Sequence, residues 1–130
     1  MTTDFFLDTS ALIELVNGTA KGASILSLVK NAGRTLVSPL NLYEFSYQAS
    51  KTKGRRSVES AIIGIKNQSE IFPVSEDVCL LAAKLRQNCE NKGMGAVDFI
   101  TAASAIASNS TLLTCDNDFR EIKELKAEFV

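Results

Sequence analysis

The stretch Phe5-Phe6-Leu7-Asp8-Thr9-Ser10 carries the clearest structural signal, because an apolar run ends there in a carboxylate and a helical pattern begins. The segment 3–7 is short and mostly apolar, which is typical of a buried strand. From Ser10 onward, apolar side chains recur at helical spacing until Asn17-Gly18 ends the pattern. A carboxylate at the end of a buried strand is costly unless something positive neutralises it, so Asp8 is a candidate ligand of a cation.

Three further segments place an acidic residue where an apolar run gives way to a helix. They are Leu40-Asn41-Leu42-Tyr43-Glu44, Ala96-Val97-Asp98 and Leu112-Leu113-Thr114-Cys115-Asp116. The chain has no histidine, so imidazole can be neither a base nor a metal ligand. Carboxylate oxygens without a nitrogen partner suit Mg²⁺ or Mn²⁺. The four segments together indicate metal-assisted phosphoryl chemistry, and therefore a nuclease.

Strand and helix patterns alternate along the chain. Short apolar runs predict strands at 3–7, 35–37, 71–74, 111–114 and 128–130, and Pro73 makes the third an edge strand or ends it. Helical spacing predicts helices at 10–17, 20–32, 39–50, 55–67, 76–89 and 97–108, with a short one from 118. Ser38, followed by proline, and Ser75 are expected N-caps. The alternation is typical of a parallel sheet in a three-layer α/β/α sandwich, whose sites lie beyond the carboxyl ends of the strands.

Length and composition favour one ordinary globular domain over residues 1–130. Apolar residues make up 45% of the chain, which is enough for one core. No apolar run approaches the roughly 20 residues of a membrane span, and the first residues lack the basic and apolar regions of a signal peptide. Three cysteines without a CxxC pair argue against a disulfide framework. We therefore expect a cytoplasmic protein with reduced thiols and no contact with membranes.

The net charge of −1 hides a local excess of positive charge. Lys51, Lys53, Arg55 and Arg56 fall within six positions, directly after the segment that carries Glu44. They are either a solvated loop or helix start, or a patch that contacts the phosphates of a nucleic acid beside the acidic site. Arg86 is a second candidate for RNA contact. The sequence shows no aromatic stacking platform of the kind found in RNA-binding modules.

Each acidic residue also has an ordinary structural explanation. Asp8 can cap the first helix, and Asp98 falls in the first turn of its helix, where the helix dipole favours negative charge. Asp118 followed by Glu121 is close to a capping box. Glu44 lies mid-helix, where exposed glutamates are common. Capping does not explain why two strand ends carry an acid with hydroxyl groups alongside, at Thr9, Ser10 and Thr114. Those hydroxyls can orient the carboxylates or hold water.

The arrangement resembles the PIN-domain family of metal-dependent ribonucleases, and in particular the small VapC-type toxins of toxin–antitoxin pairs. Nearly the whole chain takes part, through four motifs in order. They are residues 5–10, an apolar strand ending in Asp-Thr-Ser; Val37-Ser38-Pro39-Leu40-Asn41-Leu42-Tyr43-Glu44; Asp98-Phe99-Ile100-Thr101-Ala102-Ala103; and Leu112-Leu113-Thr114-Cys115-Asp116-Asn117-Asp118-Phe119.

The resemblance implies a five-stranded parallel sheet and a catalytic set of Asp8, Glu44, Asp98 and Asp116 around Mg²⁺, with Mn²⁺ as a substitute. Asp118 is a further candidate ligand, although its capping role competes. The resemblance also implies a homodimer and a small antitoxin protein as partners.

The sequence therefore predicts an endoribonuclease in which Asp8, Asp98 and Asp116 hold metal and Glu44 orients water or acts as a general base. An aspartyl phosphohydrolase would need a second Asp where Ser10 stands, and a receiver domain would need an acidic pair at Asp8 and a later lysine. A PIN-fold nuclease that processes RNA or cuts DNA, or a catalytically idle binding protein of the same fold, remains an alternative.

Overall fold

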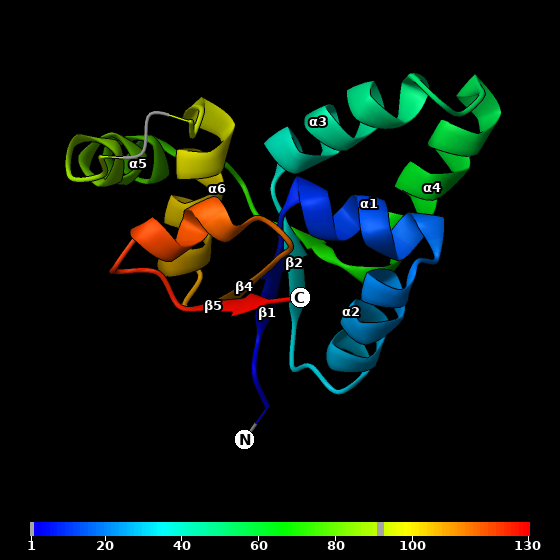
Figure 1. Cartoon of the computed structure of the whole chain (residues 1–130), viewed down its shortest axis with the longest axis horizontal. Helices are drawn as coiled ribbons and strands as arrows, with labels where there is room; N and C mark the ends of the chain where they lie inside the picture. Colours follow the sequence, from blue (N-terminus) through cyan, green and yellow to red (C-terminus); the bar gives the residue numbers. More distant parts are fainter. Residues whose placement is uncertain (1, 91–92) are drawn as a thin grey trace.

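A five-stranded parallel sheet forms the centre of the computed structural model, which describes residues 2–90 and 93–130. Its strand order is β3-β2-β1-β4-β5. The strands are β1 (Phe5–Leu7), β2 (Thr35–Val37), β3 (Glu70–Ile71), β4 (Thr111–Thr114) and β5 (Ala127–Phe129). The sheet and the surrounding helices confirm the predicted α/β fold (Figure 1).

Six α-helices cover the two faces of the sheet in the described residues. They are α1 (Thr9–Asn17), α2 (Ala20–Lys30), α3 (Pro39–Ser50), α4 (Arg55–Gln68), α5 (Glu76–Gln87) and α6 (Ala96–Ala107), followed by a short 3₁₀ helix, η1 (Asn117–Glu121). Figure 1 shows the sheet between α5 and α6 on one side and α1 to α4 on the other. Alternate strand residues divide between the two cores: Phe6 packs with Phe99 of α6, and Leu7 packs with Phe45 of α3. This division follows from the period of two along a strand.

The predicted helix starts are confirmed by their capping hydrogen bonds. The Ser38 side chain accepts from the backbone N–H of Leu40, and the Asn41 side chain accepts from the N–H of Ser38 in return. Ser75 accepts from the N–H of Val78 at the start of α5. Gly18 ends α1 with φ 64°, a left-handed conformation that favours glycine.

Most element boundaries differ from the sequence prediction by one or two residues, and two of the differences have a clear local cause. The third strand comprises Glu70–Ile71 and not residues 71–74, because its last backbone bond to β2 comes from the N–H of Phe72, and Pro73 has no N–H to continue. It is an edge strand, as the proline indicated. The final short helix begins at Asn117, one residue early, because Asp116 caps it and not Asp118.

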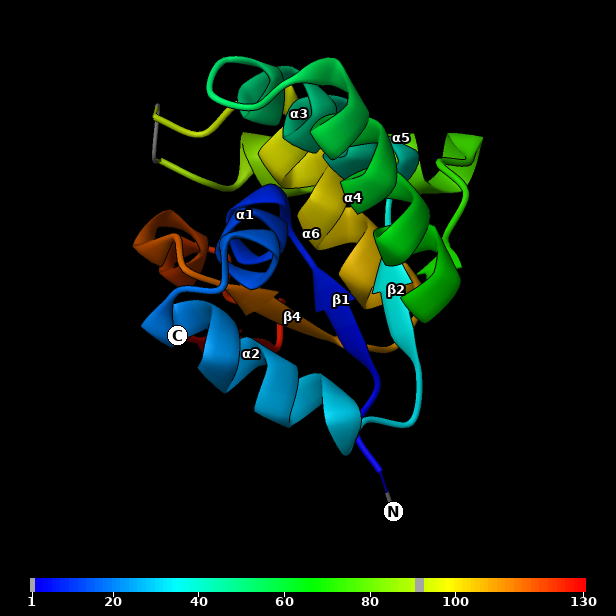
Figure 2. The same ribbon diagram turned by 90° about the vertical axis from the view of Figure 1, so that its right-hand side faces the viewer.

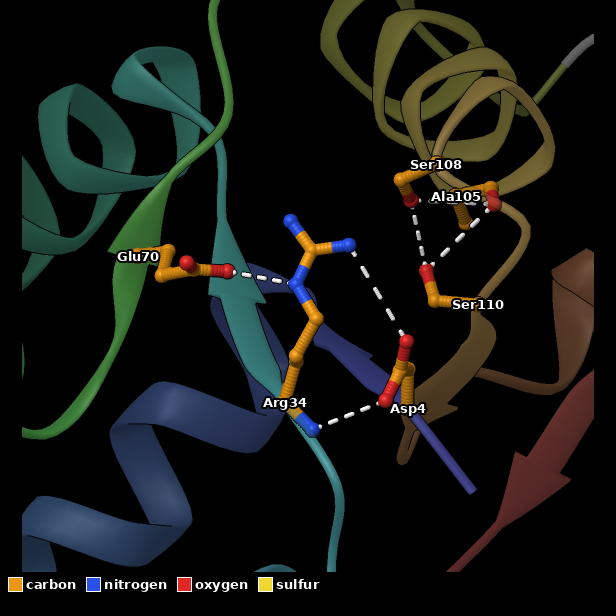
Figure 3. Close-up of polar contacts among 6 residues, drawn as sticks. All are labelled: Asp4, Arg34, Glu70, Ala105, Ser108 and Ser110. Atoms are coloured by element: carbon orange, nitrogen blue, oxygen red, sulfur yellow. Dashed lines mark hydrogen bonds and ion pairs between the residues drawn. The ribbon is translucent and has the colours of Figure 1, made fainter. Parts of the chain in front are cut away.

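At the amino edge of the sheet, one arginine forms ion pairs with two acidic residues. Nε of Arg34 lies 2.7 Å from a Glu70 carboxylate oxygen, and its guanidinium lies 4.0 Å from Asp4 (Figure 3). Exposed ion pairs of this kind contribute about 0–1 kcal/mol. At the same edge, the hydroxyls of Ser108 and Ser110 lie within hydrogen-bond distance of each other and of the carbonyl of Ala105 at the end of α6 (Figure 3).

The strands all end on the opposite edge. In Figure 2, β4, β1 and β2 lie side by side and α3 begins beyond the end of β2. Among the described residues no single helix is long and apolar enough to cross a membrane; α1 and α2 would reach that length together, but the chain bends by 105° between them.

Candidate active site at the carboxyl edge of the sheet

A pocket of about 200 Å³ lies beyond the carboxyl ends of β1 and β4. Four acidic residues predicted from the sequence line it together: Asp8, Glu44, Asp98 and Asp116. The other lining residues are Thr9, Ser10, Ile13, Asn41, Gln48 and Thr101. Residues up to 108 positions apart in the chain therefore meet at one place, where parallel α/β folds put their ligands.

Each acid reaches the pocket from a different element. Asp8 directly follows β1 and precedes α1, while Asp116 lies two residues beyond β4 and precedes η1. Glu44 comes from the middle of α3, and Asp98 from the first turn of α6. Contacts of α1 with α3 and of α3 with α6 close the ring of elements around the pocket.

Three of these acids also accept backbone hydrogen bonds at helix starts, as their structural explanation requires. Asp8 accepts from the N–H of Ala11 at 2.9 Å, Asp98 from the N–H of Gly95 at 3.0 Å, and Asp116 from the N–H of Asp118 at 2.9 Å. In Asp98 and Asp116 the cap uses one carboxylate oxygen, and the other accepts no hydrogen bond from the described residues. Capping therefore fixes these carboxylates and leaves an oxygen of each for a ligand.

The hydroxyl groups beside the acids hold two of the carboxylates in place. Asp8 accepts from Ser10 at 2.7 Å and from Thr114 at 2.5 Å, one on each oxygen. Thr9 donates to Glu44 at 2.7 Å, which joins α1 to α3. All three hydroxyls therefore lie where the sequence prediction placed them, against the carboxylates.

Sequence reasoning did not assign Asn41, Gln48 and Thr101 to the pocket. The Asn41 amide donates to Thr101 at 3.0 Å and to Thr9 at 3.3 Å, and its side chain is almost fully buried. It thereby connects α1, α3 and α6. A buried polar residue one turn before Glu44 was a usable signal, whereas Gln48 follows only from knowing which face of α3 meets the pocket.

The carboxylates of the site are close together and partly buried, which favours the binding of a positive charge. Burial raises the pKa of Asp8 to about 6, against hydrogen bonds that lower it, and the charge of Asp116 raises it further. Burial also raises the pKa of Asp98, and the charges of Glu44, Asp116 and Asp118 add to the effect. None of the four lining acids forms an ion pair with the described part of the chain, in contrast to Asp4 and Glu70 at the other edge.

A divalent cation fits this donor set. The oxygens are carboxylate and hydroxyl groups, the hard ligands that Mg²⁺ and Mn²⁺ prefer. In the part of the chain that the structure describes, no three acidic or thiol groups lie close enough together to hold one ion between them. Mg²⁺ usually keeps several waters and binds proteins through one or two carboxylates, so a pocket with room for water suits it without a closed cage.

The remaining predicted residues lie outside the pocket lining. Asp118 is exposed in η1, close enough for its charge to raise the pKa of Asp98. Arg86 lies on α5 with its guanidinium 5.6 Å from the centre of the Phe99 ring. The basic cluster, Lys51, Lys53, Arg55 and Arg56, forms the end of α3, the turn after it and the start of α4.

The fold and the pocket define a parallel α/β domain with an acidic, oxygen-lined site at the carboxyl edge of its sheet. The PIN-domain family model matches residues 5–125, and the chain belongs to that family. It is 28% identical over 124 residues to ribonuclease VapC2 of Rickettsia felis, which is 93% of this chain and 91% of the relative.

Two solved structures show the same fold. One is VapBC2 from Rickettsia felis bound to a DNA fragment from their promoter, with a TM-score of 0.81 and 27% identity over 98% of this chain and 99% of that chain. The other is a toxin–antitoxin complex from Klebsiella pneumoniae, with a TM-score of 0.74 and 21% identity over 92% of this chain and 93% of that chain.

Proposed function

We propose that the chain is a metal-dependent endoribonuclease, the toxin of a toxin–antitoxin pair that acts in the cytoplasm. The observation that carries this proposal is the set of four carboxylates that line one pocket with no cation from the described residues beside them. The family, and a relative named as a ribonuclease, support RNA as the substrate. No feature observed in the pocket specifically favours a DNA nuclease or a binding protein without catalytic activity.

Asp8, Asp98 and Asp116 would hold one or two Mg²⁺ or Mn²⁺ ions, in part through bound water, with Asp118 at the rim as a further candidate. A divalent cation there would supply acidity to water and neutralise charge on a phosphodiester. Glu44 holds one oxygen against Thr9 and leaves the other to orient water or accept its proton. Asn41 and Thr101 keep Thr9, and through it Glu44, in position. The basic cluster at the end of α3 would contact RNA phosphates.

RNA cleavage tests this proposal directly. We expect cleavage with Mg²⁺ or Mn²⁺ and none in excess chelator, because no described lysine, arginine or other cation neutralises the pocket. Ca²⁺ should compete for the site but support little turnover, since its looser coordination positions water poorly. A gel assay of one labelled RNA with Mg²⁺, with Mn²⁺, with Ca²⁺ and in excess chelator measures the extent of cleavage. Full cleavage in chelator would contradict the proposal.

A protein partner has an apolar groove available to it between α1, α2 and α4. The groove measures about 490 Å³ and is lined mainly by aliphatic side chains, among them Leu12, Val16, Val29 and Ile65. Gly64 also lines it, in the middle of α4, and a Cβ added there would meet nothing within 4 Å. Glycine inside a helix is less stable than alanine by about 1 kcal/mol, so Gly64 keeps this part of the groove open at a cost to the stability of α4. We propose that side chains of the antitoxin fill it.

Substitution of Gly64 separates the fold from partner binding. Gly64→Ala should raise the melting temperature, because it removes the helix penalty without a clash. Gly64→Glu should fold and cleave RNA but lose affinity for the proposed antitoxin, a short protein sought in the reading frames beside this one, with binding measured by calorimetry. Ser60→Glu puts the same charge on α4 outside the groove lining and is the matched control. Equal affinity of the two Glu variants for that protein would contradict a partner site in the groove.

A further inference from the structure

Two tyrosines project from α3 into solvent. Tyr43 is 64% exposed and Tyr47 is 59% exposed, while Phe45 between them is buried in the core. Residues four apart lie on one face of a helix, so the two rings share a surface. Large aromatic side chains usually bury most of their surface, and a pair exposed together indicates contact with another molecule.

The tyrosine pair borders the acidic pocket. Glu44 and Gln48, which line the pocket, each directly follow one of the tyrosines along the chain. At about 100° per residue, Tyr47 and Glu44 are separated by only about 60° around the helix axis. The row that contains Tyr43 and Tyr47 therefore runs alongside the row that lines the candidate active site.

The same row continues into positive charge. Lys51 is one turn beyond Tyr47, and its Nζ lies 4.7 Å from the centre of the Tyr47 ring. Lys53, Arg55 and Arg56 follow immediately in the turn and at the start of α4. The surface thus passes from carboxylates to aromatic rings to cations over little more than the length of α3.

We propose that Tyr43 and Tyr47 form a stacking platform for unpaired bases of single-stranded RNA, with Lys51 and the rest of the basic cluster on the adjacent phosphates. The platform rests on the proposed ribonuclease function and adds to it two residues that contact bases, Tyr43 and Tyr47. Every base has a face that stacks on a tyrosine, and the backbone needs cations nearby, which is the combination present here. The platform was not visible in the sequence, because which face of α3 is exposed depends on its packing.

A second copy of this chain fits the surface less well. The exposed row offers two tyrosines and a lysine, and a second copy would bring its own four cations to the same face. Those cations attract the phosphates of RNA, whereas they repel a surface of the same charge.

Tyrosine fluorescence reports on this surface alone, because the chain has only these two tyrosines and no tryptophan. The protein is titrated in chelator, so that RNA is not cut, with a single-stranded oligoribonucleotide and with the duplex of the same sequence. We expect the single strand to quench the fluorescence and to bind more tightly than the duplex. Tyr43→Phe and Tyr47→Phe should each keep the affinity and leave one reporting ring.

Leucine variants and the cation variant separate stacking from charge attraction. Tyr43→Leu and Tyr47→Leu should each weaken single-strand binding, on the order of tenfold, at every salt concentration. Neutralising Lys51, Lys53, Arg55 and Arg56 should instead flatten the dependence of the dissociation constant on salt, because fewer counterions are released. Melting curves should coincide for all variants, since these side chains are exposed.

Three results would overturn the platform. Unchanged fluorescence with RNA, or leucine variants that bind and cut RNA like the parent, would remove it while leaving the ribonuclease function intact. A fluorescence change on dilution without RNA, accompanied by a change of mass in sedimentation, would assign the surface to a second copy. Failure of the proposed function is distinguishable, because the oligonucleotide would then still quench the tyrosines although no RNA is cut with Mg²⁺.

Discussion

Asp98→Asn is expected to lower RNA cleavage on the order of 10²-fold or more, and Asp8→Asn likewise. An amide oxygen can still accept the capping bond from Gly95 or Ala11, so the helix starts should survive. What the substitution removes is the negative charge toward a bound cation. The measurement is the initial cleavage rate with Mg²⁺ for each variant beside the parent.

Asp4→Asn is the matched control for this loss. Asp4 lies on the same sheet but at the amino edge, where it is paired with Arg34 and far from the carboxyl ends of the strands. Its replacement should leave the cleavage rate unchanged. If Asp98→Asn and Asp4→Asn cut RNA at the same rate, Asp98 is a helix cap only and the site assignment is wrong.

The second large effect is on the stability of the metal-free protein. The pKa of Asp8 is about 6 in the folded chain against an ordinary value of 3.8, so the folded state holds its proton more tightly. The resulting stability is present below about pH 4 and is lost as the pH rises through 6. By pH 7 the charged Asp8 destabilises the fold by about 3 kcal/mol relative to its protonated form.

Asp8→Asn should therefore match the parent near pH 4 and exceed it by up to about 3 kcal/mol at pH 7. The amide can keep its oxygen on Ser10 and Ala11 and turn its NH₂ toward Thr114, which replaces the hydrogen bonds that Asp8 accepts. Urea unfolding in chelator across this pH range measures the difference. Asp8→Ala, which loses the cap as well, should gain less. A pH-independent difference between Asn variant and parent would contradict the raised pKa.

Local signals were sufficient for most of the fold. Short apolar runs located the strands, and apolar residues at helical spacing located the helices. Ser38 and Ser75 marked helix starts, because capping depends on neighbours within one turn. The edge strand at Glu70–Ile71 was misplaced because its extent is set by hydrogen bonds to β2, which lies more than thirty residues earlier.

The candidate site was predictable in its acids and not in its supporting residues. Strand ends of a parallel sheet converge by topology, so Asp8 and Asp116 could be placed together from sequence. Asn41 and Thr101 meet only because α3 packs against α6, and no local pattern encodes that contact. The exposure of Tyr43 and Tyr47 has the same origin.

The response of thermal stability to Mg²⁺ tests the central claim most directly, since it requires neither a substrate nor turnover. A ligand that binds only the folded state stabilises it in proportion to the logarithm of its concentration over its dissociation constant. Melting curves of the parent, Asp8→Asn and Asp98→Asn are recorded at neutral pH with and without Mg²⁺. The parent should melt at a higher temperature with Mg²⁺, and both Asn variants should lose that increase. A parent that ignores Mg²⁺, or Asn variants that respond to it as fully as the parent does, would contradict a metal site built on these carboxylates.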